Sequence, residues 1–127
     1  MGQQQLLLIL IGVIAVGLAI VVGINIFNNY KSTTNRDAIV GDLNNLGSHA
    51  RKYFIETRSL GGGDQSFTGW TITTGLTSND NGGYSASVTS NLVTIVGTGT
   101  QPGNDGTNPV KVTDYVTSTK DSIVINN

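Results

Sequence analysis

The sequence contains no cysteine, so disulfide bonds and thiolate metal sites are both excluded, and the redox state of its compartment cannot be inferred. Charged residues are also scarce: they make up 12% of the 127 residues, and the net charge is −1. This balance provides no basic surface, and we therefore expect no nucleic-acid partner. Proline is absent from residues 1–101, so nothing in that stretch forces a helix to break.

The longest apolar run lies near the N-terminus, where residues 6–24 contain only Leu, Ile, Val, Ala and Gly. A helix needs about 20 such residues to cross the core of a bilayer. A cleaved secretory signal explains the run less well, because no Lys or Arg precedes it and no A-x-A pattern closes it. We expect residues 3–30 to form an apolar half-helix that is retained. Its glycines at positions 12, 17 and 23 permit close helix packing or a local bend, although glycine is also common in membrane spans generally.

An amphipathic half-helix is expected over residues 31–58, because apolar residues recur there at spacings of three and four. The stripe consists of Ile39, Leu43, Leu46, Ala50, Tyr53 and Thr57, with Val40, Gly47 and Phe54 beside it. The sequence NNYKSTTN, residues 28–35, is a poor helix former and allows a loosened turn between the two half-helices. Three glycines in the loop at residues 59–66 end the helix.

Beyond residue 66, apolar residues alternate with polar ones, as expected for β-strands. We predict strands at residues 67–73, 83–90, 91–97, 109–116 and 121–126, which form an antiparallel head domain over residues 67–127. One face of such a sheet must be covered, and the stripe of the amphipathic half-helix can cover it. The predicted fold class is therefore α+β, with a long N-terminal helix whose second half packs on a four- to five-stranded antiparallel sheet. The predicted head core comprises Ile39, Leu43, Leu46, Ala50, Tyr53, Phe54, Trp70, Ile72, Val93 and Ile95.

This arrangement resembles the type IV pilin family, which includes the pseudopilins of type II secretion. The resemblance covers the whole chain: a leader ending in Gly2, an apolar run a few residues later, an amphipathic continuation, a glycine-rich loop and a Gly/Thr-rich sheet. It implies the pilin fold, and it implies that a prepilin peptidase removes residues 1–2 by cutting between Gly2 and Gln3. It further implies a precursor in the inner membrane, a pilus assembly machinery, and a helical homopolymer at the cell surface.

The resemblance also implies that the apolar half-helix serves first as a membrane anchor and then as the core of a filament. The residues expected in that core are Gln3, Leu6, Leu7, Leu10, Ile14, Gly17, Val21, Ile24 and Phe27. Three features depart from the family pattern: the leader lacks basic residues, the C-terminal cysteine pair is missing, and Leu7 stands where most members have glutamate. That glutamate pairs with the N-terminal amine of a neighbour. The amides of Gln3, Gln4 and Gln5 are candidates for a weaker, uncharged contact in its place.

Three functions fit these features. The first is a structural subunit, a major pilin, of a type IV-pilus-like filament that contributes to adhesion at the cell surface. The second is a pseudopilin whose short filament acts as a piston in secretion, and the third is a single-pass membrane protein that displays a small β-rich binding domain. Lys31 and Arg36 follow the apolar run, so the positive-inside rule places the head in the cytoplasm, whereas the resemblance places it outside.

Catalytic and cofactor signals are weak. The sequence has no nucleophile elbow and no phosphate loop, and we expect no enzymatic activity and no cofactor. A single histidine, His49, without any cysteine rules out the usual haem and zinc ligand sets. Asp105, Asp114 and Asp121 can converge in principle, but nothing in their spacing suggests it.

Two loops offer oxygen ligands of the kind that calcium requires, at residues 77–83 and 102–108. The candidate ligands are Asn79, Asp80, Asn81 and Asp105. The first loop resembles part of an EF-hand but lacks its repeated acids and its final glutamate. Asn-Gly and Asp-Gly pairs also form turns, which is the interpretation we favour.

Overall fold

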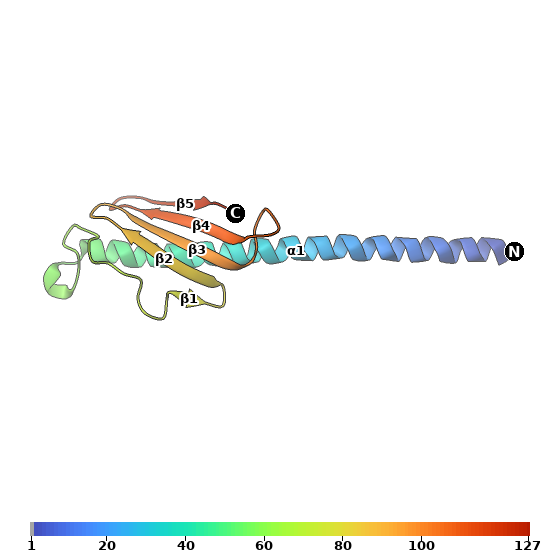
Figure 1. Cartoon of the computed structure of the whole chain (residues 1–127), viewed down its shortest axis with the longest axis horizontal. Helices are drawn as coiled ribbons and strands as arrows, with labels where there is room; N and C mark the ends of the chain where they lie inside the picture. Colours follow the sequence, from blue (N-terminus) through green and yellow to red (C-terminus); the bar gives the residue numbers. More distant parts are fainter. Residues whose placement is uncertain (1) are drawn as a thin grey trace. The chain divides into compact units, whose positions relative to one another are not determined.

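The computed structural model describes residues 2–127, which form one long helix, a short 3-10 helix and a five-stranded sheet (Figure 1). The elements are α1 (Gly2–Ile55), η1 (Arg58–Leu60), β1 (Ser78–Asn79), β2 (Gly82–Val88), β3 (Val93–Pro102), β4 (Pro109–Val116) and β5 (Asp121–Ile125). The fold class is α+β, as predicted. The chain divides into two compact units, which we call the rod (residues 2–31) and the head (Ser32–Asn127), and α1 contributes to both.

Helix α1 is continuous through residues 28–35, so the loosened turn that the sequence allows there does not form. The helix ends at Ile55, slightly before the predicted end at residue 58. The glycine-rich loop then folds back on it: Gly63 N–H donates to the Tyr53 carbonyl (2.7 Å) and Gln65 N–H donates to the Phe54 carbonyl (2.8 Å). These bonds satisfy carbonyl groups that a helix C-terminus otherwise leaves without partners.

The five strands pair in chain order, each antiparallel to the next, so the sheet is a simple meander. Strands β2, β3, β4 and β5 lie where the sequence predicts strands, although β3 continues well beyond residue 97. The two-residue strand β1 was not predicted; it is the first arm of a tight hairpin with β2, in which Ser78 is opposite Gly83.

The predicted strand at residues 67–73 is wrong, because this segment is an irregular loop. Trp70 N–H donates to the Phe67 carbonyl (2.9 Å), which closes a turn. Gly69 lies inside that turn with a φ of 92°, in the region that favours glycine and does not occur in a strand. The loop instead contributes side chains to the core: Phe67 is fully buried, and its ring centroid lies 4.7 Å from that of Phe54.

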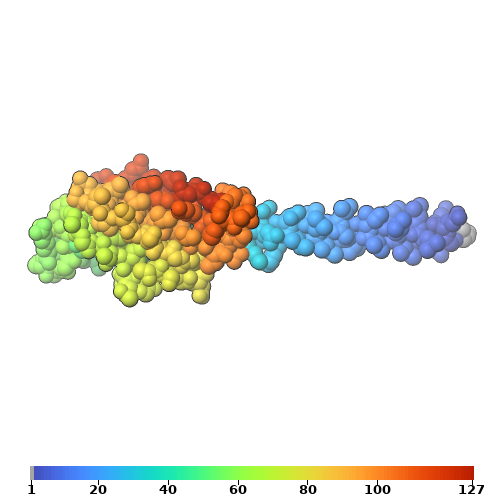
Figure 2. Space-filling model, viewed as in Figure 1, coloured from blue at the N-terminus to red at the C-terminus, as the bar shows by residue number. Residues whose placement is uncertain are grey.

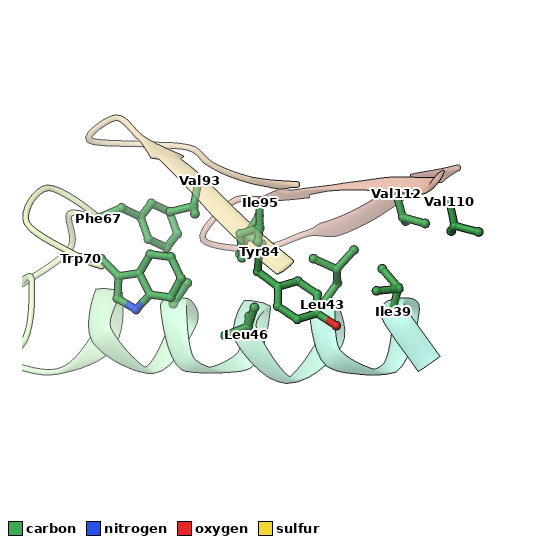
Figure 3. Packing of buried hydrophobic residues seen from close by; sticks show 12 residues of the cluster. Ile39, Leu43, Leu46, Phe67, Trp70, Tyr84, Val93, Ile95, Val110 and Val112 are labelled. Atoms are coloured by element: carbon green, nitrogen blue, oxygen red, sulfur yellow. The ribbon is translucent and has the colours of Figure 1, made fainter. Parts of the chain in front are cut away.

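The head core lies between one face of α1 and the inner face of the sheet (Figure 3). Of the predicted core residues, the buried ones are Ile39, Leu43, Leu46, Ala50, Trp70, Val93 and Ile95, and those packed against them but only partly buried are Tyr53, Phe54 and Ile72. The prediction omitted Phe67, Tyr84, Val110, Val112 and Val116, which are buried as well. Each large apolar side chain buried in this way stabilises the head by about 1.5–3 kcal/mol.

The first turns of α1 within the head are fastened to β3 through a buried amide. The Asn35 side chain accepts a hydrogen bond from Thr100 N–H (3.1 Å) and donates one to the Asn81 carbonyl (2.9 Å). A methyl group at Gly99 would overlap this amide, so the close approach of helix and strand requires glycine there. The amide satisfies backbone groups of β3 at the point where the register between β3 and β4 shifts.

Candidate functional site

The rod carries apolar surface on every side. All of its described residues are exposed, and Figure 2 draws their surface in blue. The large apolar side chains among residues 6–27 are 54–69% exposed. This follows from a sequence that is apolar at every helical position, so no rotation of the helix presents a polar face. Contiguous apolar surfaces of this extent on a folded chain mark membrane or protein contact sites.

The rod also has the length of a membrane span. Among the described residues, α1 is the one helix that is long and apolar enough to cross a bilayer. Residues 6–27 extend about 33 Å at about 1.5 Å per residue, which matches a hydrocarbon core of about 30 Å. In length and composition the rod is therefore compatible with insertion into a membrane.

The residues predicted for a filament core all lie on this exposed surface: Gln3, Leu6, Leu7, Leu10, Ile14, Gly17, Val21, Ile24 and Phe27. Most of them follow spacings of three and four and so share one side of the helix. The other sides are equally apolar, since Leu8 and Val13 are 69% and 66% exposed. The predicted stripe is therefore not distinguished from the rest of the rod, and contacts are available in every direction.

Three glycines of the rod have no role within the chain. A methyl group at Gly12, Gly17 or Gly23 would meet nothing within 4 Å, and α1 is uninterrupted at all three positions. Neither close packing within the chain nor a helix break explains them. Two interpretations remain: glycine is common in membrane spans generally, or these glycines allow another helix to approach closely.

The rod is uncharged over its whole length up to Tyr30. Its first turn contains no acidic residue, and Leu7, at the position where the resemblance expects glutamate, is 57% exposed. The first charged side chain is that of Lys31, whose Nζ lies 4.8 Å from the centroid of the Phe27 ring. A partner can therefore cover the rod without desolvating a side-chain charge.

The candidate calcium ligands are used in turns. In the β1–β2 hairpin, Asn79 Oδ1 accepts hydrogen bonds from the N–H groups of Asn81 (2.8 Å) and Gly82 (3.2 Å). In the other loop, Asp105 Oδ1 accepts from the N–H groups of Thr107 and Asn108, both at 2.9 Å. These bonds, from Thr107 first, lower the pKa of Asp105 to about 2. Both loops therefore have the geometry of turns, which is the interpretation favoured from the sequence.

The amide groups of the β1–β2 hairpin point at a carboxylate on α1. Asp42 Oδ2 accepts hydrogen bonds from the side-chain amides of Asn79 (2.9 Å) and Asn81 (3.0 Å) and from the Tyr84 hydroxyl. Burial alone would raise the pKa of Asp42, but these hydrogen bonds together lower it. Burial and the contact with Asp42 raise the pKa of Tyr84. The cluster fastens the hairpin to the helix. In it the side-chain N–H groups of Asn79 and Asn81 act as hydrogen-bond donors, and a donor N–H group is not a metal ligand.

Among residues 2–127, no group of three or more His, Cys, Asp or Glu side chains is arranged to hold a metal ion. His49 is exposed and lines a shallow groove on the head together with Lys52 and Glu56. Of the three aspartates whose convergence the sequence left open, Asp114 and Asp121 come together next to α1, whereas Asp105 is engaged in its own turn. The spacing gave no signal for this pair.

No protein-family model, no characterised protein and no solved structure matches the chain. The exposed apolar rod is thus the feature of the molecule that calls for a functional explanation.

Proposed function

We propose that the chain is the structural subunit of an extracellular filament of the type IV pilus kind, assembled through the rod. The observation that carries the proposal is the apolar surface of the rod, with large side chains that are 54–69% exposed, on a helix that continues into a folded head. Such a surface requires a cover. Lipid of the inner membrane covers it before assembly, and other copies of the rod cover it afterwards.

The free energy of exposing this surface to water supports the exchange of lipid for sister copies. At about 25 cal/mol per Å² of apolar area, exposure of the rod costs on the order of tens of kcal/mol. Identical rods offer the same apolar chemistry as lipid, and no side-chain charge in residues 3–30 has to be desolvated. Close approach at Gly12, Gly17 and Gly23 adds van der Waals contact between helices.

An open filament follows from the way in which identical rods can meet. Because every side of the rod is apolar, one side of a copy can pack on a different side of the next. Contacts of this heterologous kind propagate into a helical polymer when their rotation does not close a ring. The head, rich in Ser, Thr, Asn and Gly, then provides a hydrated outer shell.

The proposal includes processing before assembly. A prepilin peptidase removes residues 1–2, so Gln3 becomes the first residue of the mature subunit, and the assembly machinery extracts that subunit from the inner membrane. Because Leu7 stands at the expected glutamate position, the ion pair expected from the family is missing. Uncharged contacts of the glutamine amides take its place.

Analysis of sheared surface material tests the proposal. We expect long filaments whose abundant subunit is this chain, with an N-terminal peptide that begins at Gln3, and none in a strain from which the chain has been deleted. Cryo-electron microscopy of the fibres should place the rods at the centre. Short periplasmic assemblies required for protein secretion would replace the pilus by the pseudopilus. A monomeric membrane protein with an intact Met1 would contradict filament formation and leave a displayed binding domain.

A further inference from the structure

Strand β4 has an aspartate at a core position that its neighbours fill with valine. Val112 and Val116, two residues to either side of Asp114, are fully buried, and Asp114 itself is 0% exposed. In the sheet, Asp114 is opposite Ile95 of β3 and Ile123 of β5, so its neighbours across the strands are apolar. A carboxyl group in such surroundings requires a hydrogen-bonding or ionic partner.

That partner is the carboxyl group of Asp121, at the start of β5. Both groups point at Gly47 of α1: a methyl group at Gly47 would come within 2.8 Å of Asp121 Oδ2 and 3.0 Å of Asp114 Oδ2. Glycine at this helix position leaves the space in which the two carboxyl groups meet. Both oxygens of Asp114 and Oδ1 of Asp121 are buried and receive no hydrogen bond from the described donors.

The other charged group that faces the pair is Arg51, one turn further along α1. No ion pair joins Arg51 to either carboxyl group, and its buried Nε has no partner among the described residues. From β3 the pair is faced by Ile95, and from β5 by Ile123, neither of which can donate a hydrogen bond. Two adjacent carboxylates without a donor repel each other, so one of them must bind a proton.

We propose that Asp114 and Asp121 hold one proton between them, and that this shared proton fastens β4 to the start of β5 beside Gly47 of α1. The proton comes from solvent through the partly exposed Asp121, and only an O–H bond is made or broken. With the proton bound, one carboxyl group donates to the other, and the pair carries a single negative charge that Arg51 partly offsets. Without it, two negative charges lie side by side under the sheet. The proposal does not depend on filament formation.

The sign of the resulting pH dependence follows from the direction of the pKa shift. Burial first, and the Asp121 carboxyl second, raise the pKa of Asp114 to about 8, while Arg51 opposes the increase. In an unfolded chain the pKa of Asp is about 3.9. Between these values the folded head holds a proton that the unfolded head releases, so stability is complete below the window and is lost as pH rises through it. We expect the unfolding equilibrium constant to rise by up to about tenfold per pH unit.

The test is urea unfolding of the full-length chain in detergent micelles, from about pH 5 to about pH 9, followed by tryptophan fluorescence. Trp70 is the only tryptophan and is 7% exposed in the head core, so it reports on the head alone. Wild type should lose stability as pH rises to about 8 and level off above it, whereas Asp114→Asn should remove most of that slope. Asp80→Asn, which removes the same charge from an exposed turn, should keep the wild-type slope. The single histidine, His49, is present in all variants, so it cannot account for a difference in pH slope between them.

An infrared measurement keeps the test decisive if Asp114→Asn does not fold. Wild type at neutral pH should show the C=O stretch of a protonated carboxylic acid, which disappears as the pH is raised through about 8. Equal pH slopes in wild type and Asp114→Asn, or the absence of that band at neutral pH, would overturn the proposal. Stabilisation by added Ca²⁺ at alkaline pH, reversed by EDTA, would also overturn it, because a cation would then occupy the place of the proton.

Discussion

Leu10 and Leu43 are the same residue type on the same helix, yet Leu10 is 57% exposed and Leu43 is 0% exposed. The difference lies in what the chain supplies around them. The head provides a sheet that covers one stripe of α1, and polar residues occupy the remaining sides of the helix there. The rod is apolar on all sides, and no described segment covers it. One half of α1 thus completes its folding within the chain, and under the proposed function the other half is covered by lipid or by further copies.

Placing a charge in the rod should have the largest effect. Val16 lies near the middle of the apolar run and is 61% exposed, so we expect Val16→Asp to abolish filaments by burying an unpaired carboxylate between copies. In a bilayer the same substitution costs about 2.5–3.5 kcal/mol, which a run of this length tolerates. Filaments are counted by electron microscopy, with membrane fractionation to verify insertion and Val16→Leu as the matched control. Normal filaments from Val16→Asp would contradict assembly through the rod.

Leucine truncation should separate the two units. We expect Leu43→Ala to lower the free energy of unfolding of the head by about 2–5 kcal/mol, because it leaves a cavity in the core. Leu10→Ala, the same change on the rod, should leave the unfolding of the head unchanged. Denaturant unfolding in detergent, followed by Trp70 fluorescence, measures both variants. An equal loss of head stability from Leu10→Ala would show that the two units are not energetically separate.

Filling a glycine of the rod should have a smaller effect. Gly23→Leu makes the rod more apolar, so membrane insertion should be retained, but it prevents close approach of a second helix. We expect fewer or structurally altered filaments, visible in cryo-electron microscopy as a changed helical repeat. Val22→Leu adds volume at the neighbouring position and serves as the control. If both variants assemble alike, the glycine reflects only the general composition of membrane spans.

Replacing the glutamines should have the smallest effect. Changing Gln3, Gln4 and Gln5 together to alanine removes the amide groups proposed to replace the missing ion pair, and each hydrogen bond contributes about 0.5–1.5 kcal/mol. We expect slower assembly or filaments that break at lower shear, measured by the yield of sheared fibres. Unchanged yield and strength would mean that these amides make no assembly contact.

Local patterns in the sequence were sufficient for the helix and for strands β2 to β5. The spacing of the buried α1 residues places them on one side of a helix whatever the tertiary structure: they are Ile39, Leu43, Leu46 and Ala50. Likewise, the alternation of apolar and polar residues in 109–116 gives a strand with one apolar face. The same alternation in residues 67–73 was misleading. There, Gly69 adopts a left-handed conformation and closes a turn, so that Phe67 and Trp70 enter the core from a loop.

The carboxyl pair could not be predicted, because it depends on three elements at once. The β4–β5 register brings Asp114 near Asp121, and the packing of α1 sets Gly47 above both. One sequence signal did exist: Asp114 occupies an inward position in the alternation that Val110, Val112 and Val116 otherwise fill. A polar residue at such a position indicates a buried interaction, but its partner emerges only from the tertiary structure.

Sedimentation of the purified full-length chain after detergent removal tests the dependence of the rod on an external cover most directly. We predict that the chain leaves the supernatant as polymers, because the apolar side chains of residues 6–27 cannot remain 54–69% exposed to water. A soluble, monodisperse monomer under the same conditions would contradict the account.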